Sequence, residues 1–563
     1  MKISKIIECV PNFSEGRDPM VIQAIQDEIS KVGGVKLLHV DMGKSTHRTV
    51  VTFAGSPEAV VEAAFQAIRV AAEKIDMRHH RGEHPRMGAT DVCPLVPVQG
   101  ITLEETVFYA RQLAERVGQE LAIPVYLYEA AATAELRRNL ATIRSGEYEG
   151  LEEKMKLKEW SPDFGPKLFN PKSGATVIGA RDFLIAYNVN LNTSSVKLAN
   201  EVAFDVRENG RTLKDPISGA IVKDESGEPK RLPGMCPSVK AIGWFIEEYG
   251  LAQVSMNLTN MHLTSLHRAF ESCRKSAEQR GLLVTGSELV GLIPKKALVE
   301  AGKYFLQKQN RSTGVSEQEI IHIAVQSLGL NSLQPFDPQT RIIEYMLEEN
   351  NKELVSMSLE KFVRETSSES PAPGGGSVSA YAGALGAALG CMVANLTAHK
   401  KGYENQLDFF SGIAEQAQQK INELLFLVDE DTRAFNSILE ALRMPKQTVE
   451  EKKARKKALR SANKKAIEVP YQTMKVAASC LDFILQMVEK GNPNSVSDAG
   501  VGALCIETAV RGAGLNVHIN SAGLEDEEKK KYYLEKASKL ESKTIQTVGK
   551  IIDNVKMKMS VHP

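Results

Sequence analysis

Several features that define common protein classes are absent or scarce in this sequence. Lys+Arg and Asp+Glu both number 70, so the chain has no net charge that would attract nucleic acid or a membrane surface. The seven cysteines form no C-x-x-C pair and their number is odd, which argues against a disulfide framework or a zinc cluster and suits a reducing cytosol. No G-x-G-x-x-G follows the first expected strand, so a dinucleotide fold is not indicated. We therefore expect a cytoplasmic protein that binds no nucleic acid.

The length of the chain predicts several domains, since 563 residues are too many for one core. Short β-branched runs alternate with amphipathic helices in the first half, and strand signals nearly vanish in the second. We predict an α/β (α+β, ferredoxin-like) sheet subdomain at 1–180, a smaller one at 181–346, a linker at 347–356 and an all-α helical bundle at 357–563. The strands expected first are 3–10, 35–40, 48–54, 92–98 and 124–127, and the helices 19–32, 57–75 and 103–121. Residues 209–236 are expected to be a polar surface excursion.

The stretch 374–398 contains no charged residue and is long enough to span a bilayer. It is mostly Ala, Gly and Ser, so its transfer into lipid would be weakly favourable. The small-xxx-small spacing of Gly386 and Gly390 allows two helices to approach closely. We expect a buried core or interface helix, and no membrane contact.

A basic loop, residues 78–88, contains three of the 11 histidines and three arginines. One interpretation is a metal site, because residues 80–84 fit the H-x-x-E-H pattern, although Gly82 and Pro85 disfavour the helix that it needs. A second is a general base, since nearby guanidinium groups would keep an imidazole neutral while they hold an anionic substrate. A third is a solvated basic loop without a catalytic role.

Other motifs allow both a binding and a structural interpretation. Asp41, at a strand end, could orient a catalytic imidazole or cap a turn. Residues 160–174, with three prolines and several aromatics, could bind a flat heterocycle or link domains. Residues 371–378 open a helix whose amides could hold an anion, but they lack the Lys-Ser/Thr of a P-loop. Residues 428–435 place three carboxylates in an apolar helix, where a solvated face is the ordinary interpretation.

Three of these segments, together with one near the N-terminus, carry a family resemblance. Gly82-Glu83-His84-Pro85-Arg86-Met87-Gly88, together with Cys9-Val10-Pro11-Asn12-Phe13-Ser14-Glu15-Gly16, resembles the formiminotransferase domain of the bifunctional formimidoyltransferase-cyclodeaminase family. Residues 371–378 and 428–435, in this order, resemble the cyclodeaminase domain of the same family. The resemblance runs through most of the chain.

The resemblance implies a transferase fused to an ammonia lyase, acting in histidine degradation and one-carbon metabolism. A formimidoyl group would pass from N-formimidoyl-L-glutamate to tetrahydrofolate, and the product would cyclise to 5,10-methenyltetrahydrofolate with release of ammonia. His84 would be the first catalytic acid/base, with Asp41 beside it, and Asp431 the second catalytic residue. Arg48 and Arg86 are candidates for the donor's carboxylates. The implied folate contacts are Gly165, Pro166, Lys167, Leu168, Phe169, Asn170, Pro171, Lys172, Ser173 and Gly174, with Gly374, Gly375 and Gly376 at the second site.

The family further implies a homo-oligomer assembled through the helical domain, and a tetrahydrofolate substrate that carries a polyglutamate tail. Neither a metal nor a nucleotide is required by this chemistry. Two alternatives stay open on the sequence: a zinc-dependent hydrolase built on His80 and His84, and a non-catalytic oligomeric folate-binding scaffold.

Overall fold

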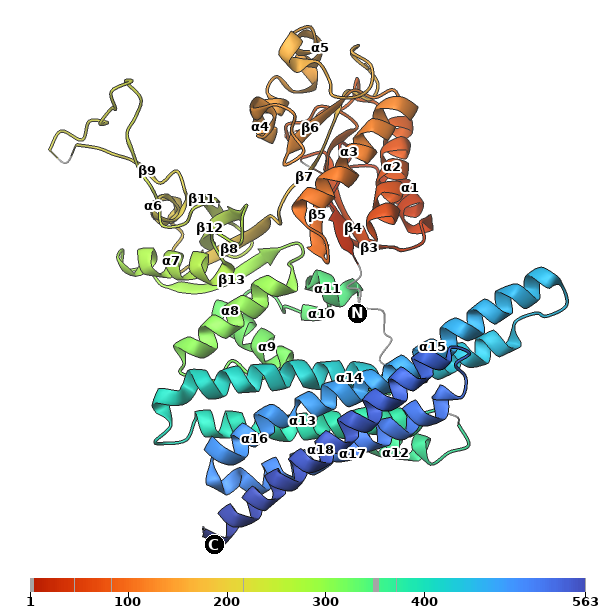
Figure 1. The fold of residues 1–563 in the computed structure, drawn as a ribbon. Helices are drawn as coiled ribbons and strands as arrows, with labels where there is room; N and C mark the ends of the chain where they lie inside the picture. Colours follow the sequence, from red (N-terminus) through yellow and green to blue (C-terminus); the bar gives the residue numbers. More distant parts are fainter. Residues whose placement is uncertain are drawn as a thin grey trace. The chain divides into compact units, whose positions relative to one another are not determined.

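The computed structural model describes residues 5–44, 46–82, 84–215, 217–347, 354–370 and 372–561, and they form two compact units. One unit contains Met1–Ala301 and Val325–Glu348, and the other contains Gly302–Ala324 and Glu349–Pro563. The first is built on two sheets and the second is helical, which confirms the expected fold class (Figure 1).

The first sheet has seven strands in the order β1-β4-β2-β5-β7-β6, with β3 paired to β4. Its strands β5, β7 and β6 run parallel to one another, whereas the other pairs are antiparallel. Three amphipathic helices pack against it and bury isoleucine, valine and alanine side chains in a common core (Figure 1). The elements are β1 (Ile6–Cys9), β2 (Asn12–Phe13), α1 (Pro19–Lys31), β3 (Val35–Gly43), β4 (Arg48–Gly55), α2 (Pro57–Lys74), β5 (Thr90–Gln99), α3 (Leu103–Glu120), β6 (Val125–Glu129) and β7 (Thr176–Ala180).

Between β6 and β7 the chain makes short helices that cover a second apolar cluster around Tyr126 and Trp160. These are η1 (Glu135–Arg137), α4 (Leu140–Arg144), α5 (Glu147–Met155) and η2 (Lys158–Trp160). Arg137 fixes this region because its guanidinium pairs with Asp163 at 2.7 Å and donates to two backbone carbonyls. Two of these helices contact the segment before and at the start of β5, since Arg144 pairs with Asp91 while Glu147 and Glu149 pair with Arg86.

The second sheet is antiparallel, with the order β11-β12-β8-β13 and with α6 and α7 packed on one face. A two-stranded ribbon, β9 with β10, lies within residues 209–236 and extends away from this sheet (Figure 1). The bounds are β8 (Ile185–Leu191), α6 (Val196–Val206), β9 (Arg211–Thr212), β10 (Arg231–Leu232), β11 (Val239–Ile246), β12 (Leu251–Leu258), α7 (Leu266–Glu278), β13 (Val284–Val290), α8 (Lys295–Lys308), α9 (Glu317–Leu328), α10 (Pro338–Arg341) and α11 (Ile343–Leu347).

The helical unit is organised around α13, the uncharged helix. It is the one described helix that is long and apolar enough to cross a membrane, but most of it is buried inside this unit. Gly386 faces the backbone of Gly502, where a Cβ would meet the carbonyl oxygen at 2.7 Å, so the small residues serve close helix packing. The helices are α12 (Leu359–Thr366), α13 (Gly375–Ala398), η3 (Glu404–Gln406), α14 (Leu407–Arg443), α15 (Val449–Ser479), α16 (Leu481–Lys490), η4 (Pro493–Ser495), α17 (Val496–Ser521) and α18 (Glu527–Val561).

Pro470 lies inside α15, which continues through it to Ser479 although a proline ordinarily ends or kinks a helix. Proline has no N–H to donate to the carbonyl of residue 466. The side chain of Asn520 donates to that carbonyl at 2.8 Å and so satisfies it from the neighbouring helix α17. A tertiary hydrogen bond therefore replaces the missing helical one.

Candidate active sites

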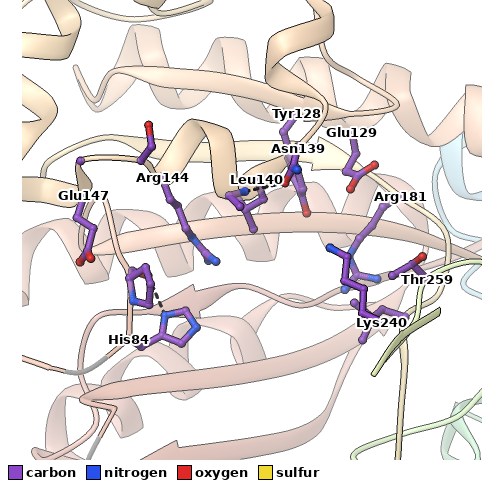
Figure 2. Close-up of a pocket in the computed structure, with 15 residues that line it drawn as sticks. His84, Tyr128, Glu129, Asn139, Leu140, Arg144, Glu147, Arg181, Lys240 and Thr259 are labelled. Carbon is purple, nitrogen blue, oxygen red and sulfur yellow. Dashed lines mark hydrogen bonds between the residues drawn. The ribbon is translucent and has the colours of Figure 1, made fainter. Parts of the chain in front are cut away.

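His84 lies in the loop before β5 and lines a cavity of about 480 Å³ (Figure 2). The loop is held by buried hydrogen bonds, from the Ala89 amide to Ser173 O at 2.9 Å and from the Ser14 hydroxyl to Gly88 O at 2.8 Å. The cavity is lined by His84, Pro85, Tyr128, Glu129, Asn139, Leu140, Ala141, Arg144, Ser145, Gly146, Glu147, Arg181, Leu184, Lys240 and Thr259.

The hydrogen bonding of His84 determines which of its ring nitrogens carries the proton. Nδ1 lies 2.7 Å from the carbonyl oxygen of Pro85, and because a carbonyl only accepts, Nδ1 carries the proton. Burial lowers the pKa of His84 below its ordinary value, and the positive charges of Arg48 and Arg144 lower it further. The ring is therefore neutral near pH 7, and Nε2 retains a lone pair that can accept a proton.

Two guanidinium groups, Arg48 and Arg144, act electrostatically on His84. Arg48 donates to the side-chain oxygen of Asn12, but its Nε is buried without a hydrogen-bond partner in the described chain. Burial lowers the pKa of Arg48 to about 10. Arg48 thus acts as a positive charge on the imidazole, and its predicted role in binding a carboxylate of the donor stays a prediction.

The acidic partner in this cluster is Asp91, which the sequence did not single out. Asp91 is buried, pairs with Arg144 and accepts the Met87 amide at 3.1 Å. Its charge opposes the lowering of the His84 pKa. Asp41, the predicted partner, is exposed on β3, and no hydrogen bond of the described residues joins it to His84. Asp91 therefore acts electrostatically on the imidazole, whereas Asp41 acts on Arg48. The predicted role of Asp41 as the partner of His84 stays a prediction.

Arg86 was predicted to hold a substrate carboxylate, but its guanidinium is already committed to the protein. The side chain is buried and donates to Glu147 at 2.8 Å and to Glu149 at 2.6 and 2.8 Å. Its Nε donates to Nδ1 of His80 at 3.2 Å. These contacts fix the loop, and four of the five guanidinium N–H groups are used in them. The predicted role of Arg86 in binding a carboxylate of the donor stays a prediction.

His80 is unsuited to the zinc alternative because both of its ring nitrogens are used. Nδ1 accepts from Arg86, and Nε2 donates to the carbonyl of His47 at 2.8 Å. The ring stacks on His47, with centroids 4.3 Å apart. A metal would have to break one of these bonds and approach a cluster of arginines. The remaining member of the pattern, Glu83, lies outside the described residues.

The segment from Gly165 to Gly174 supports the His84 loop without lining its cavity. Gly174 forms a β-bridge with Gly88, and a Cβ on Gly174 would lie 2.1 Å from Met87 O, so only glycine fits. Lys172 donates to Glu73 O at 2.8 Å, and Tyr148 donates to Pro171 O at 2.5 Å. The first half of the segment, including Leu168, is exposed. Its predicted contact with folate therefore stays a prediction.

A second candidate site lies where Asp431 of α14 meets the start of α13. The Ser377 hydroxyl is within hydrogen-bond distance of Val428 O at 2.9 Å and of Asp431 Oδ2 at 3.2 Å. Burial raises the pKa of the Asp431 carboxyl above its ordinary value, and the hydrogen bonds from Ser377 offset this only in part. A Cβ on Gly376 would lie 2.2 Å from Asp431 Oδ1. The predicted glycine motif and the predicted acid are thus adjacent.

The three carboxylates of this helix have separate environments, so the interpretation as a solvated face is wrong. Asp429 is buried and accepts the Leu354 amide at 2.8 Å. Glu430 pairs with Arg433 at 2.6 Å and with Lys465 at 3.1 Å. Asp431 combines a raised pKa with proximity to the start of α13.

The two sites define a class of enzyme that works by acid–base chemistry on charged substrates. One offers a neutral imidazole between arginines, and the other a partly buried carboxyl that holds its proton more strongly than usual. Within the described ranges, no group of three His, Cys, Asp or Glu side chains is arranged to hold a metal ion.

Comparison with known proteins identifies the family. The N-terminal subdomain of the formiminotransferase domain matches residues 6–181, the formiminotransferase domain matches 186–348, and formiminotransferase-cyclodeaminase matches 358–539. The chain is 45% identical to a formimidoyltransferase-cyclodeaminase of Gallus gallus, over 98% of this chain and 97% of that protein. It is 46% identical to a glutamate formimidoyltransferase of Thermoplasma acidophilum, which covers 54% of this chain and 92% of that protein.

The helical half also has a relative of its own. A methenyltetrahydrofolate cyclohydrolase of Methylorubrum extorquens is 38% identical over 30% of this chain and 81% of that protein. The chain belongs to the formimidoyltransferase-cyclodeaminase family, and the resemblance seen in the sequence is confirmed.

Proposed function

We propose that His84 and Asp431 each catalyse one of the two reactions of this bifunctional enzyme. The first transfers the formimidoyl group from N-formimidoyl-L-glutamate to N5 of tetrahydrofolate. The second cyclises 5-formimidoyltetrahydrofolate to 5,10-methenyltetrahydrofolate and releases ammonia. The observation that carries the proposal is the placement of the two groups: His84 lines a cavity with Nδ1 bonded to Pro85 O, and the Asp431 carboxyl lies against Ser377 and Gly376. The pKa is lowered at His84, as suits a base, and raised at Asp431, as suits an acid.

In the transfer, N5 attacks the formimidoyl carbon and must lose its proton, while the leaving glutamate nitrogen must gain one. Nε2 of His84 can accept the first proton and deliver the second, because Nδ1 stays bonded to Pro85 O throughout. Arg48 and Arg144 would stabilise the donor's carboxylates. Asp91 positions Arg144 through their buried ion pair.

In the cyclisation, N10 attacks the same carbon within one molecule, so that positioning supplies much of the rate. The proton of N10 passes to the formimidoyl nitrogen, which becomes an amine on the tetrahedral carbon. The leaving ammonia needs a proton, and a carboxyl with a raised pKa can donate it. The Asp431 carboxylate that remains would stabilise the delocalised cation of the product.

The proposal is tested by measuring the two reactions separately in His84→Gln and Asp431→Asn variants. Formation of 5-formimidoyltetrahydrofolate from both substrates reports the first reaction, and methenyl absorbance from supplied 5-formimidoyltetrahydrofolate reports the second. We expect each variant to lose roughly 10²–10⁴-fold in its own reaction and to retain the other. Loss of both reactions in either variant, with the fold intact by circular dichroism, would contradict separate sites.

We propose in addition that the enzyme is a homo-oligomer assembled through the helical unit. Two packed helices, α13 and α17, carry exposed apolar side chains at helical spacing: Val378, Leu385, Met392 and Leu396 on the first, and Val501, Leu504, Leu515 and Ile519 on the second. Sedimentation of Leu385→Glu and Leu504→Glu variants should show dissociation, whereas an unchanged sedimentation coefficient would argue against this surface.

We propose further that the enzyme is cytoplasmic, because its seven cysteines are free, as expected in a reducing compartment.

We also propose that the natural substrate carries a polyglutamate tail. The lysine-rich start of α15 would attract this chain of carboxylates. A triglutamate substrate should then have a lower KM than the monoglutamate at low salt, and equal KM values would refute the tail contact.

A further inference from the structure

The buried hydroxyl of Ser377 has more possible partners than it has hydrogens to donate. Ser377 lies in the first turn of α13 and is fully buried. Its Oγ lies 2.9 Å from Val428 O, 3.2 Å from Asp431 Oδ2 and 3.3 Å from Oγ1 of Thr432. All three partners belong to α14. A hydroxyl has one hydrogen, so it donates to one of these oxygens at a time.

Two of these acceptors depend on the hydroxyl to different degrees. Val428 O lies inside α14, where the backbone amide four residues further along the helix can serve it without Ser377. The carboxyl of Asp431 lies flat against Gly376, since an added Cβ there would be 2.2 Å from Oδ1 and 2.5 Å from Oδ2. An ionised carboxylate attracts a hydroxyl more strongly than a neutral carbonyl does. The hydrogen of Ser377 therefore has a reason to change acceptor when Asp431 loses its proton.

The charged residues beside Asp431 on α14 already have partners. Asp429 is buried and accepts a backbone amide at 2.8 Å. Glu430 pairs with Arg433 at 2.6 Å and with Lys465 of α15 at 3.1 Å. A new negative charge on Asp431 has to be stabilised by another group.

The groups that α13 and α17 place beside Asp431 are uncharged. Helix α13 contains no charged residue from Gly375 to Ala398. On the α17 side, Gly375 faces the side-chain amide of Asn516, whose Nδ2 would lie 3.5 Å from an added Cβ. In the described chain, burial raises the pKa of Asp431 and the hydrogen bonds from Ser377 lower it. Ser377 is thus placed to respond to the charge of this carboxyl.

We propose that Ser377 is a positioning residue whose hydroxyl rotates from Val428 O to Asp431 Oδ2 as Asp431 protonates the leaving ammonia. The proposal rests on the proposed cyclisation, in which Asp431 is the acid. The O–H bond of the carboxyl breaks and its hydrogen joins the leaving nitrogen, while the C–N bond breaks and its electron pair stays on that nitrogen. The rotated hydroxyl then stabilises the new carboxylate. Because this contact strengthens only as the charge develops, it lowers the barrier more than the energy of the starting complex.

The experiment measures cyclisation of supplied 5-formimidoyltetrahydrofolate against pH by methenyl absorbance. Ser377→Ala should lower kcat about 10- to 100-fold, the loss expected for a hydrogen bond to a charged group. Without the hydroxyl the carboxylate is less stable, so the pKa of Asp431 rises further. The fall in rate at high pH, where the acid has lost its proton, should therefore move to higher pH. A merely structural change would lower the rate at every pH and leave the position of this fall unchanged.

Ser379→Ala is the matched control. Ser379 is a second buried serine of α13, but its hydroxyl donates to Gly375 O at 2.6 Å. Its replacement should change neither kcat nor the pH profile. Ser377→Cys keeps a weak donor and should move the profile in the same direction by less than Ser377→Ala, so it decides the question if the alanine variant does not fold.

A pH profile that keeps its position in Ser377→Ala, with the circular dichroism of the wild type, would overturn the proposal. An equal shift in Ser379→Ala would also overturn it. The Asp431→Asn variant separates this failure from that of the proposed function. If Asp431→Asn still cyclises the substrate, Asp431 is not the acid and the proposed function fails. If it is inactive while the Ser377→Ala profile stays in place, the rotation of the hydroxyl alone is refuted.

Discussion

Replacing Gly376 by alanine would place a methyl group where the Asp431 carboxylate now lies. The added Cβ would be 2.2 Å from Oδ1, 2.5 Å from Cγ and 2.5 Å from Oδ2. A carbon and an oxygen need about 3.5 Å, so the carboxylate must move by about 1 Å or more. That movement breaks the 3.2 Å contact with Ser377.

The expected effect is on chemistry more than on stability. Displacing a catalytic group by about 1 Å costs on the order of 10²-fold in rate. Overpacking destabilises by about 1–3 kcal/mol, whereas alanine in place of glycine in a helix stabilises by about 1 kcal/mol. The two stability terms largely cancel, and the free energy of unfolding should fall by only about 1 kcal/mol.

The assay supplies 5-formimidoyltetrahydrofolate and follows methenyl absorbance, with formimidoyl transfer measured in parallel. Cyclisation should fall about 100-fold and transfer should stay within twofold. Gly412→Ala is the matched control, because no atom lies within 4 Å of a Cβ at that position of α14. Cyclisation within twofold of wild type in Gly376→Ala would refute the assigned position of Asp431.

Three further predictions follow from single contacts. Arg48→Met removes a positive charge that lowers the pKa of His84, so the rise of kcat/KM for transfer with pH should move to higher pH; an unchanged pH–rate profile would contradict the electrostatic contact. Arg86→Met breaks ion pairs with two partly exposed glutamates and should lower the free energy of unfolding, measured by urea denaturation, by about 2 kcal/mol. A rise in the KM for the formimidoyl donor without loss of stability would instead support a role of Arg86 in binding the donor. Asn520→Ala leaves the Ala466 carbonyl unsatisfied and should cost about 1 kcal/mol, and an unchanged unfolding midpoint would show that water replaces the amide.

The regular elements were predictable because their local signals agree with their tertiary environment. The expected strand 48–54 and helix 103–121 correspond to β4 (Arg48–Gly55) and α3 (Leu103–Glu120), each within a residue or two. At the start of α3, Thr102 forms a capping box with Glu105, so the cap is made by residues only three positions apart. The continuity of helix α15 at Pro470 is not a local property, because it depends on the hydrogen bond from Asn520, 50 residues further along the chain.

In the two candidate sites, the sequence could single out only residues that stand in a recognisable short motif. The histidine and the helical aspartate stood in unusual local sequences, whereas Asp91 is hidden in an apolar strand and Arg144 in a short helix without a motif. No local pattern showed that Arg86 would be occupied by Glu147 and Glu149, because those partners lie 61 and 63 residues away. Contacts between segments that are distant in the sequence decide which charged side chains already have partners. One sequence alone does not show these contacts.

In the proposed transfer, Nε2 of His84 accepts the proton of N5 while the pterin occupies the cavity beside it. A crystal structure of the enzyme with 5-formyltetrahydrofolate would measure this geometry. We predict N5 of the pterin within about 2.6–3.2 Å of Nε2, or joined to it through one water, with Nδ1 still bonded to Pro85 O. A pterin bound away from this cavity, or an imidazole whose Nε2 is bonded to a protein group in the complex, would contradict it.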